Sequence, residues 1–154
     1  IIMAERTLIL IKPDAVQRHL AGQIISRFER KGLKIVAGRF MRASQELARK
    51  HYAVHEGRDF YEPLVRYLMS SPVLAMVWEG EHAIDIARNL MGPTFGPDAP
   101  PGTIRGDLSR SMRYNLVHGS DSPEAAEREI ALWFEPEQIV EYDLDDRFWY
   151  TGKK

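Results

Sequence analysis

The sequence of 154 residues is 44% hydrophobic and 28% charged, which is ordinary for a globular protein, and its formal net charge is −1. The near-neutral charge argues against a surface devoted to nucleic acid, and the absence of cysteine excludes disulfides, thiol catalysis and cysteine-ligated zinc. The length predicts a single domain over residues 1–154, whose acidic closing segment, 135–154, wraps the surface.

The sequence contains no pattern typical of export or membrane insertion. No run approaches the roughly 18 apolar residues of a membrane span, and the opening residues lack the apolar core and cleavage pattern of a signal peptide. Met3 is interpreted as the initiator, with Ile1 and Ile2 as an extension. We therefore expect a cytoplasmic protein.

In the first half of the chain, the apolar pattern predicts alternating strands and helices. Thr7 to Ile11 is a continuous run rich in branched residues, typical of a central strand buried on both faces. Gly22 to Lys31 carries apolar residues at helical spacing and stops at Gly32. The next predicted elements are a strand from Leu33 to Arg42, a helix capped by Ser44 that runs to Tyr52, and a helix from Phe60 to Met69.

The second half continues the alternation around a long loop. Val73 to Trp78 predicts a third buried strand, His82 to Leu90 a helix, and Pro123 to about Phe134 a further helix. Residues 91–102 are rich in proline and glycine, and long ordered loops in compact domains are usually functional. The order of elements predicts an α+β fold of the ferredoxin-like, split-βαβ type, with helices packed on an antiparallel four-stranded sheet and an inserted loop.

The segment 115–122 presents one histidine in a setting suited to chemistry. The apolar pair Leu116-Val117 predicts a strand end that delivers His118 to a turn at Gly119, and Ser122 is suited to cap the following helix. A strand-to-helix turn exposes its side chain beside free backbone N–H groups, which favour anions such as phosphate. We interpret His118 as a nucleophile that becomes phosphorylated.

A histidine nucleophile needs one free ring nitrogen and an acceptor that holds the other. In a helix that starts near Ser122, the side chain of Glu129 points back toward His118, although a solvated surface charge is the alternative interpretation. Phosphoryl transfer also needs positive charge around the phosphates. Candidates for that role are Lys12 at a strand end, Arg88, Thr94 and Arg105, although each taken alone is better explained as a surface charge or a turn residue.

Other patterns are given little weight. His51 and His55 are spaced to share one helix face, but no third zinc ligand is evident. Residues 105–107 spell the adhesion tripeptide Arg-Gly-Asp, which we interpret as coincidental. Phe60 is a candidate for stacking on a base, and because no glycine-rich nucleotide fingerprint is present, any nucleotide must be bound by other means.

Five separated motifs resemble those of the nucleoside diphosphate kinase family along nearly the whole chain. They are ERTLILIKPDAV at 5–16, FYEPLV at 60–65, MVWEG at 76–80, PGTIRGD at 101–107 and NLVHGSDS at 115–122. The resemblance implies a ping-pong reaction that maintains NTP and dNTP pools. His118 would take the terminal phosphoryl group of a nucleoside triphosphate, typically ATP, and pass it to a nucleoside diphosphate.

The resemblance also implies roles for individual residues. It makes Glu129 the residue that orients His118, with Ser120 nearby. The positions that it implies for phosphate and ribose contacts are Lys12, Tyr52, Arg88, Thr94, Arg105 and Asn115, of which Lys12, Tyr52 and Asn115 also count as catalytic. Phe60 and Met112 would hold the base, and Mg²⁺ would arrive with the nucleotide, bound mainly by phosphates and water without direct protein ligands.

The resemblance further implies a homo-oligomer, a hexamer with a tetramer as the alternative. Two departures from the family pattern matter here. After Thr94 the family usually has Asn or Asp and then Pro, where this chain has Phe95-Gly96-Pro97, and this loop makes subunit contacts in family members. The second departure concerns base binding, since Met112 stands where the family commonly has valine on the other side of the base from Phe60. Methionine is also apolar, so we expect base binding to be kept.

Two other functions are weaker interpretations. A catalytically silent nucleotide-binding module would be favoured by the loss of His118, Lys12 or Arg105, and all three are present. A nucleic-acid-binding protein would need a basic sheet face with exposed aromatic residues, which the apolar strands and the net charge of −1 do not provide.

Overall fold

The computed structural model describes residues 4–153, so the interpretation of Ile1, Ile2 and Met3 falls outside the described residues. Within residues 4–153, four strands form one antiparallel sheet in the order β2-β3-β1-β4. The strands are β1 (Glu5–Ile11), β2 (Lys34–Met41), β3 (Val73–Gly80) and β4 (Val117–Gly119). Because β3 separates β1 from β2, this is the split-βαβ arrangement, and the predicted α+β class is confirmed.

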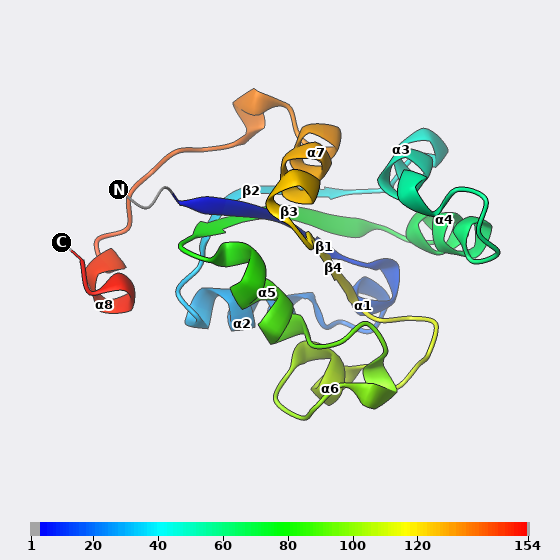
Figure 1. The fold of residues 1–154 in the computed structure, drawn as a ribbon, viewed down its shortest axis with the longest axis horizontal. Helices are drawn as coiled ribbons and strands as arrows, with labels where there is room; N and C mark the ends of the chain where they lie inside the picture. The colour runs from blue at the N-terminus through cyan, green and yellow to red at the C-terminus, as the bar shows by residue number, and fades with distance from the viewer. Residues whose placement is uncertain (1–3, 154) are drawn as a thin grey trace.

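Helices cover both faces of this sheet (Figure 1). The α-helices are α1 (Pro13–Gln17), α2 (Ala21–Arg30), α3 (Gln45–His51), α4 (Tyr61–Met69), α5 (Ala83–Met91), α6 (Ile104–Leu108), α7 (Pro123–Trp133) and α8 (Arg147–Thr151). Three short 3₁₀ turns join them within the described range, η1 (Ala53–His55), η2 (Gly96–Asp98) and η3 (Pro136–Gln138). The strands and helices predicted before residue 92, and the helix from Pro123, are found within two residues of their expected bounds.

The central strand β1 is buried on both faces because each face packs against a separate apolar layer. Leu8 and Leu10 join a cluster that includes Trp133 of α7 and residues of α3 and α4. Ile9 and Ile11 join the opposite cluster, which contains residues of α2 and α5. The continuous apolar run of β1 thus follows from its position between two helical layers.

The last part of the chain lies along the outer strand β2. The Val140 backbone N–H donates to the Val36 carbonyl at 2.8 Å, and the Tyr142 hydroxyl donates to the carbonyl of Ile35. The ring of Tyr150 in α8 lies directly over Gly32. None of the helices in the described range has the length and apolar character that crossing a bilayer demands.

Candidate active site

His118 lies in the middle of β4, opposite Leu10 of β1, and the strand continues through Gly119, where a turn was predicted. Pairing with β1 continues on both sides of the histidine. The Ser120 N–H donates to the Leu8 carbonyl at 3.1 Å, and the Lys12 N–H donates to the Leu116 carbonyl at 2.8 Å. The sheet therefore fixes the backbone that carries the histidine.

The chain enters β4 through a tight turn at Leu116. Leu116 has a left-handed φ of 70°, so it does not belong to the strand as predicted, and the Val117 N–H donates to the Asn115 carbonyl at 2.7 Å. Such a conformation costs about 1–3 kcal/mol for a bulky residue. It is held by complete burial of the Leu116 side chain and by its N–H, which donates to the Asp14 carboxylate at 3.2 Å.

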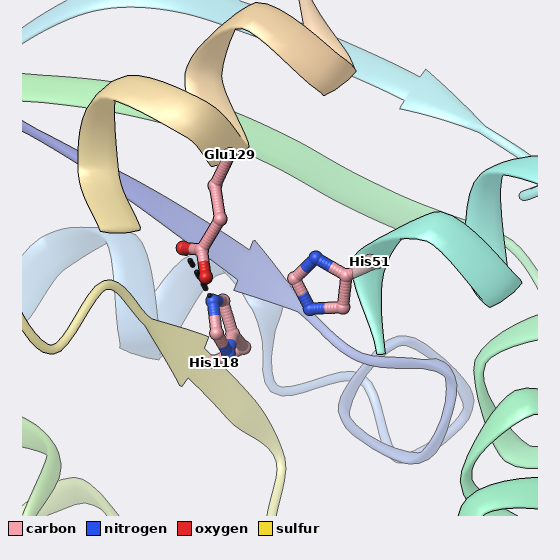
Figure 2. Close-up of side chains that lie close together, drawn as sticks. All are labelled: His51, His118 and Glu129. Atoms are coloured by element: carbon pink, nitrogen blue, oxygen red, sulfur yellow. Dashed lines mark hydrogen bonds and ion pairs between the residues drawn. The ribbon is translucent and has the colours of Figure 1, made fainter. Parts of the chain in front are cut away.

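A buried carboxylate holds one ring nitrogen of His118. Glu129 Oε1 lies 2.9 Å from His118 Nε2 (Figure 2). The Ser120 hydroxyl donates to the same oxygen at 2.8 Å. The Ser120 oxygen in turn accepts the Leu8 backbone N–H at 3.1 Å. Because a carboxylate accepts hydrogen bonds, the His118 proton resides on Nε2, and Nδ1 keeps a free lone pair.

The surroundings keep His118 uncharged and Glu129 charged. Burial lowers the pKa of His118 below its ordinary value, and the charges of Lys12 and Arg105 lower it further against the opposing effect of Glu129. Burial raises the pKa of Glu129, but its hydrogen bonds with His118 and Ser120 bring that pKa below the ordinary value. At neutral pH the pair is therefore an imidazole held by a carboxylate, as a histidine nucleophile requires.

Lys12, Asn115 and Thr94 form a connected set. Lys12 Nζ donates to the Asn115 side-chain oxygen at 2.8 Å, and the Asn115 amide donates to the Thr94 carbonyl at 3.1 Å. Burial and the nearby Arg105 lower the pKa of Lys12 to about 7, while Asp14 opposes that change. The amine lies 5.3 Å from the centre of the Tyr67 ring.

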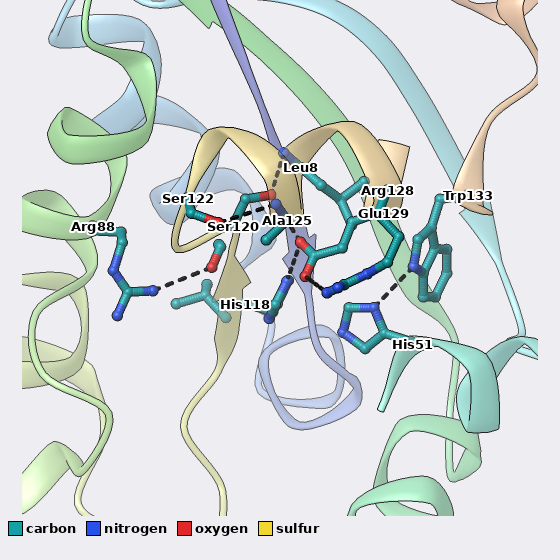
Figure 3. Close-up of polar contacts among 12 residues, drawn as sticks. Leu8, His51, Arg88, His118, Ser120, Ser122, Ala125, Arg128, Glu129 and Trp133 are labelled. Atoms are coloured by element: carbon teal, nitrogen blue, oxygen red, sulfur yellow. Dashed lines mark hydrogen bonds and ion pairs between the residues drawn. The ribbon is translucent and has the colours of Figure 1, made fainter. Parts of the chain in front are cut away.

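Two arginines border β4. Arg105 is 5% exposed and donates from three nitrogens to the carbonyls of Asn115 at 3.1 Å, Gly92 at 2.8 Å and Val117 at 2.7 Å. Two of its five N–H groups remain for a ligand. Its burial also means that the arginine of the Arg-Gly-Asp tripeptide is not presented at the surface. Arg88 donates to the Gly119 carbonyl at 3.3 Å (Figure 3).

The predicted base-binding residues are exposed, with 48% of Phe60 and 61% of Met112 accessible. Phe60 packs edge-on against His55, with ring centres 5.1 Å apart. Because α3 ends at His51 and His55 lies in η1, the two histidines do not share the helix face that their spacing allowed. Tyr52 is buried, and its hydroxyl has no hydrogen-bond partner among residues 4–153.

His51 belongs to the site, although its sequence position gave no such indication. Its ring centre lies 4.5 Å from that of His118. His51, His118 and Glu129 each offer a ligand atom within 4.8 Å of the others, a composition found in metal centres. However, the Trp133 indole N–H donates to His51 Nδ1 at 3.1 Å, so the remaining nitrogen of His51 carries its hydrogen. His118 Nε2 is thus engaged with Glu129 and His51 Nδ1 with Trp133, so each histidine already uses one ring nitrogen in a hydrogen bond.

Known proteins resemble the chain in sequence and in fold. The family model for nucleoside diphosphate kinase matches residues 5–139. The chain belongs to the nucleoside diphosphate kinase family. A relative from Staphylococcus epidermidis with that name is 52% identical over 145 residues, covering 94% of this chain and 97% of the relative.

Solved nucleoside diphosphate kinases have the same fold. A halophilic one from Halobacterium salinarum, in complex with CDP, has a TM-score of 0.94 and 51% identity, covering 96% of this chain and 99% of the other. One from Borrelia burgdorferi, a transition-state mimic with vanadate and ADP, has a TM-score of 0.90 and 36% identity, covering 96% and 98%. As a nucleoside diphosphate kinase family member, the chain is a phosphotransferase, and the family uses a divalent metal ion with the nucleotide.

Proposed function

We propose that His118 carries the phosphoryl group from a nucleoside triphosphate, typically ATP, to a nucleoside diphosphate, which maintains the NTP and dNTP pools. The observation that carries the proposal is the 2.9 Å contact between His118 Nε2 and Glu129, which leaves Nδ1 free, and burial favours the uncharged ring by lowering the pKa of His118. The CDP and the ADP with vanadate in the two solved relatives support nucleotides as the ligands.

The reaction has two halves. In the first, the Nδ1 lone pair attacks the terminal phosphorus, an N–P bond forms, and the bond from phosphorus to the bridging oxygen breaks, which releases the diphosphate. The ring then carries a positive charge, because Nε2 keeps its hydrogen, and the Glu129 carboxylate compensates that charge. In the second half, an oxygen of another diphosphate attacks the phosphorus and the electron pair returns to Nδ1.

The other residues of the site bind and orient the nucleotide. Lys12, Arg88 and the two free N–H groups of Arg105 neutralise phosphate charge, which is the main requirement of this chemistry. Tyr52, Thr94 and Asn115 supply neutral polar groups for the phosphates and ribose. The exposed apolar side chains of Phe60 and Met112 hold the base between them. Such an apolar contact tolerates many different bases.

The residues around His118 fit an Mg²⁺ ion that arrives with the nucleotide. Glu129, the carboxylate that contacts His118, is already bonded to His118 and Ser120, and the charged groups facing the phosphates are cations. Such a site lacks the oxygen ligands of a protein cage, so phosphates and water would hold the ion. When bound, Mg²⁺ would supply charge neutralisation on the phosphates.

We also propose a cytoplasmic homo-oligomer, a hexamer with a tetramer as the alternative. Exposed apolar side chains support association, since Phe40 on the outer strand β2 is 65% exposed and Trp149 is 82% exposed. The loop with Phe95-Gly96-Pro97 is folded into η2 and presents Phe95 at the surface. Sedimentation velocity of the full chain would give the mass of the assembly.

The decisive experiment is incubation of the protein with terminally labelled ATP. We expect an acid-labile phosphate on His118 that a different nucleoside diphosphate removes, with no label on a His118→Ala variant. Label that persists in that variant, or that a second diphosphate does not discharge, would contradict the mechanism.

If Glu129 only orients His118, its replacement should slow phosphoryl transfer without weakening nucleotide binding. Replacing it with alanine removes the acceptor that fixes the His118 tautomer, so we expect transfer to slow by about 10²-fold or more. Nucleotide affinity, measured by calorimetry, should change little because Glu129 faces the histidine and not the phosphates. An equal loss of affinity and rate would exclude the orienting role.

A further inference from the structure

The surroundings of His51 allow it a single protonation state. Its side chain is 5% exposed, Nδ1 accepts the Trp133 indole N–H at 3.1 Å, and Nε2 is buried without a partner among residues 4–153. An indole nitrogen is a donor only, so Nδ1 must offer its lone pair and the hydrogen must reside on Nε2. A second proton could enter only at Nδ1, where it would face the indole N–H and break the bond.

Charged and titratable groups face His51 from every packed element. They are His118 of β4, Arg128 and Glu129 of α7, Lys12 after β1, and Tyr52 and His55 beyond α3. Burial first, and then His118, Lys12, Arg128 and His55, lower the pKa of His51 well below its ordinary value. The indole bond and the surrounding charge therefore both keep the ring neutral.

The neutral ring of His51 packs against the nucleophile. The two imidazoles meet at an interplanar angle of 80°, with centres 4.5 Å apart, on the side of His118 away from Arg88 (Figure 3). A half-turn of the His118 ring about its side-chain bond would put Cε1 in the place of Nε2 and Cδ2 in the place of Nδ1, which would break the hydrogen bond to Glu129. Close packing by His51 opposes that rotation. A charged His51 at this distance would also oppose the positive charge that His118 carries once phosphorylated.

We propose that His51 is a positioning residue for phosphoryl transfer, which Trp133 fixes as an uncharged Nε2–H imidazole so that it holds the His118 ring in place. This inference rests on the proposed phosphorylation of His118. It assigns Trp133, 82 residues from His51 along the chain, an indirect effect on the reaction through the tautomer of His51. Neither residue contacts the transferred group.

The test is the single-turnover rate of His118 phosphorylation between about pH 5 and about pH 8, in wild type and in Trp133→Phe. Without the indole N–H, His51 Nδ1 can take a proton, so we expect the variant to lose about tenfold in rate relative to wild type near pH 6. Near pH 8 it should stay within about threefold of wild type. Trp78→Phe is the matched control, because Trp78 is also a fully buried indole but packs in the opposite layer. Its pH profile should equal that of wild type.

Substitution of His51 supplies a second, independent test. Glutamine places an uncharged N–H near the original Nε2 and cannot titrate, so Trp133→Phe combined with His51→Gln should regain the wild-type pH profile. His51→Ala should slow phosphorylation about tenfold at every pH, because the His118 ring is no longer held. This comparison remains informative if Trp133→Phe does not fold.

The outcomes separate this inference from the proposed function. Absence of phosphate on wild-type His118 would overturn both. Two results would overturn the positioning role alone, provided that wild-type His118 is labelled normally. One is the same pH profile for Trp133→Phe and Trp78→Phe. The other is the same rate for His51→Gln and His51→Ala. Nitrogen chemical shifts of His51 in wild type should show an unprotonated Nδ1, and a protonated Nδ1 would contradict the tautomer assignment.

Discussion

At the scale of single residues, Lys12 would need a positive charge to bind phosphate, but its buried position disfavours that charge. Its amine is buried at the end of β1 beside Arg105, and burial lowers its pKa from 10.5 to about 7. Bound phosphates would add negative charge next to the amine and raise that pKa again. Nucleotide binding should therefore be linked to the uptake of a proton.

We predict that binding of a nucleoside diphosphate near pH 8 takes up close to one proton at Lys12, and less near pH 6. The sign follows from the lowered pKa, since free Lys12 is mostly neutral above about pH 7 and the complex restores its charge. Calorimetric titrations in two buffers with different ionisation enthalpies would measure the uptake.

Lys12→Gln is the control for this linkage. Its binding should be weaker, and the extra proton uptake near pH 8 should disappear because no other group in that position can accept it. Uptake that is unchanged in Lys12→Gln would assign the proton to another group, such as His118.

Which site residues could be predicted depends on how far apart they lie in the chain. Glu129 lies 11 residues from His118, within the next helix, so helical periodicity alone directed it to the histidine. Trp133 and His51 are separated by 82 residues, and Asp14 and Leu116 by 102. No local pattern encodes such contacts, which arise because β1, β4, α3 and α7 meet in three dimensions.

At the scale of elements, the loop that departs from the family pattern is tightly packed. Gly96 begins η2 and lies against Ser109, so that a Cβ at this position would come within 2.4 Å of the Ser109 carbonyl oxygen and hydroxyl. The backbone of Gly96 is not left-handed, so its requirement for glycine is steric. The loop is thus fitted to its own sequence around η2.

Gly96→Ala should lower the free energy of unfolding by about 1–3 kcal/mol, the usual cost of an extra carbon in a packed site. Gly22→Ala is the opposite case, because nothing lies within 4 Å of a Cβ in this exposed part of α2. There alanine should raise the free energy of unfolding by about 0.5 kcal/mol through its helix preference. Urea unfolding of the three proteins measures both changes, and equal stability of Gly96→Ala and wild type would contradict the packing argument.

The elements that the sequence did not predict are short. The helices α1, α6 and α8 each span five residues, less than the two turns that an apolar repeat needs to be recognised. Cap signals were present all the same, with Pro13 at the first position of α1 and the Thr103 hydroxyl accepting the Gly106 N–H in α6. The strand β4 has three residues, so its extent was set by pairing with β1 and not by its own sequence.

At the scale of the whole molecule, the two buried histidines link folding to pH. Burial lowers the pKa of both His51 and His118, so the unfolded chain binds protons there that the folded chain does not. Stability must then fall as the pH drops below about 6.5, the ordinary histidine value. Above that pH neither state is protonated at these positions, and this contribution vanishes.

We predict that His51→Gln makes the loss of stability in acid smaller. A histidine that remains neutral in the folded state lowers the free energy of unfolding by about 2 kcal/mol between neutral pH and about pH 5, and glutamine removes this contribution. Urea unfolding at fixed protein concentration at the two pH values measures it. His19→Asn, at an exposed site with a left-handed φ of 59° that asparagine accepts, should behave as wild type. An identical acid loss in His51→Gln would show that other groups cause it.

The fold class was accessible from the sequence because apolar periodicity records which faces are buried, and the alternation of elements leaves few ways to cover one sheet. The order of the strands required the pairing itself. A strand of three residues at the sheet edge, β4, carries His118, and the apolar pattern gave only its approximate position.

Arg88 and Arg105 also affect whether a further strand can pair with the β4 edge of the sheet. At an open sheet edge, outward carbonyls recruit strands from other chains. The outward carbonyls of β4, on Val117 and Gly119, are already bonded to Arg105 and Arg88. Removal of these guanidinium groups would thus uncover a template for strand addition next to His118. At the opposite edge, Val140 and Tyr142 of the closing segment bond to the carbonyls of Val36 and Ile35, so the chain covers part of β2 in the same way.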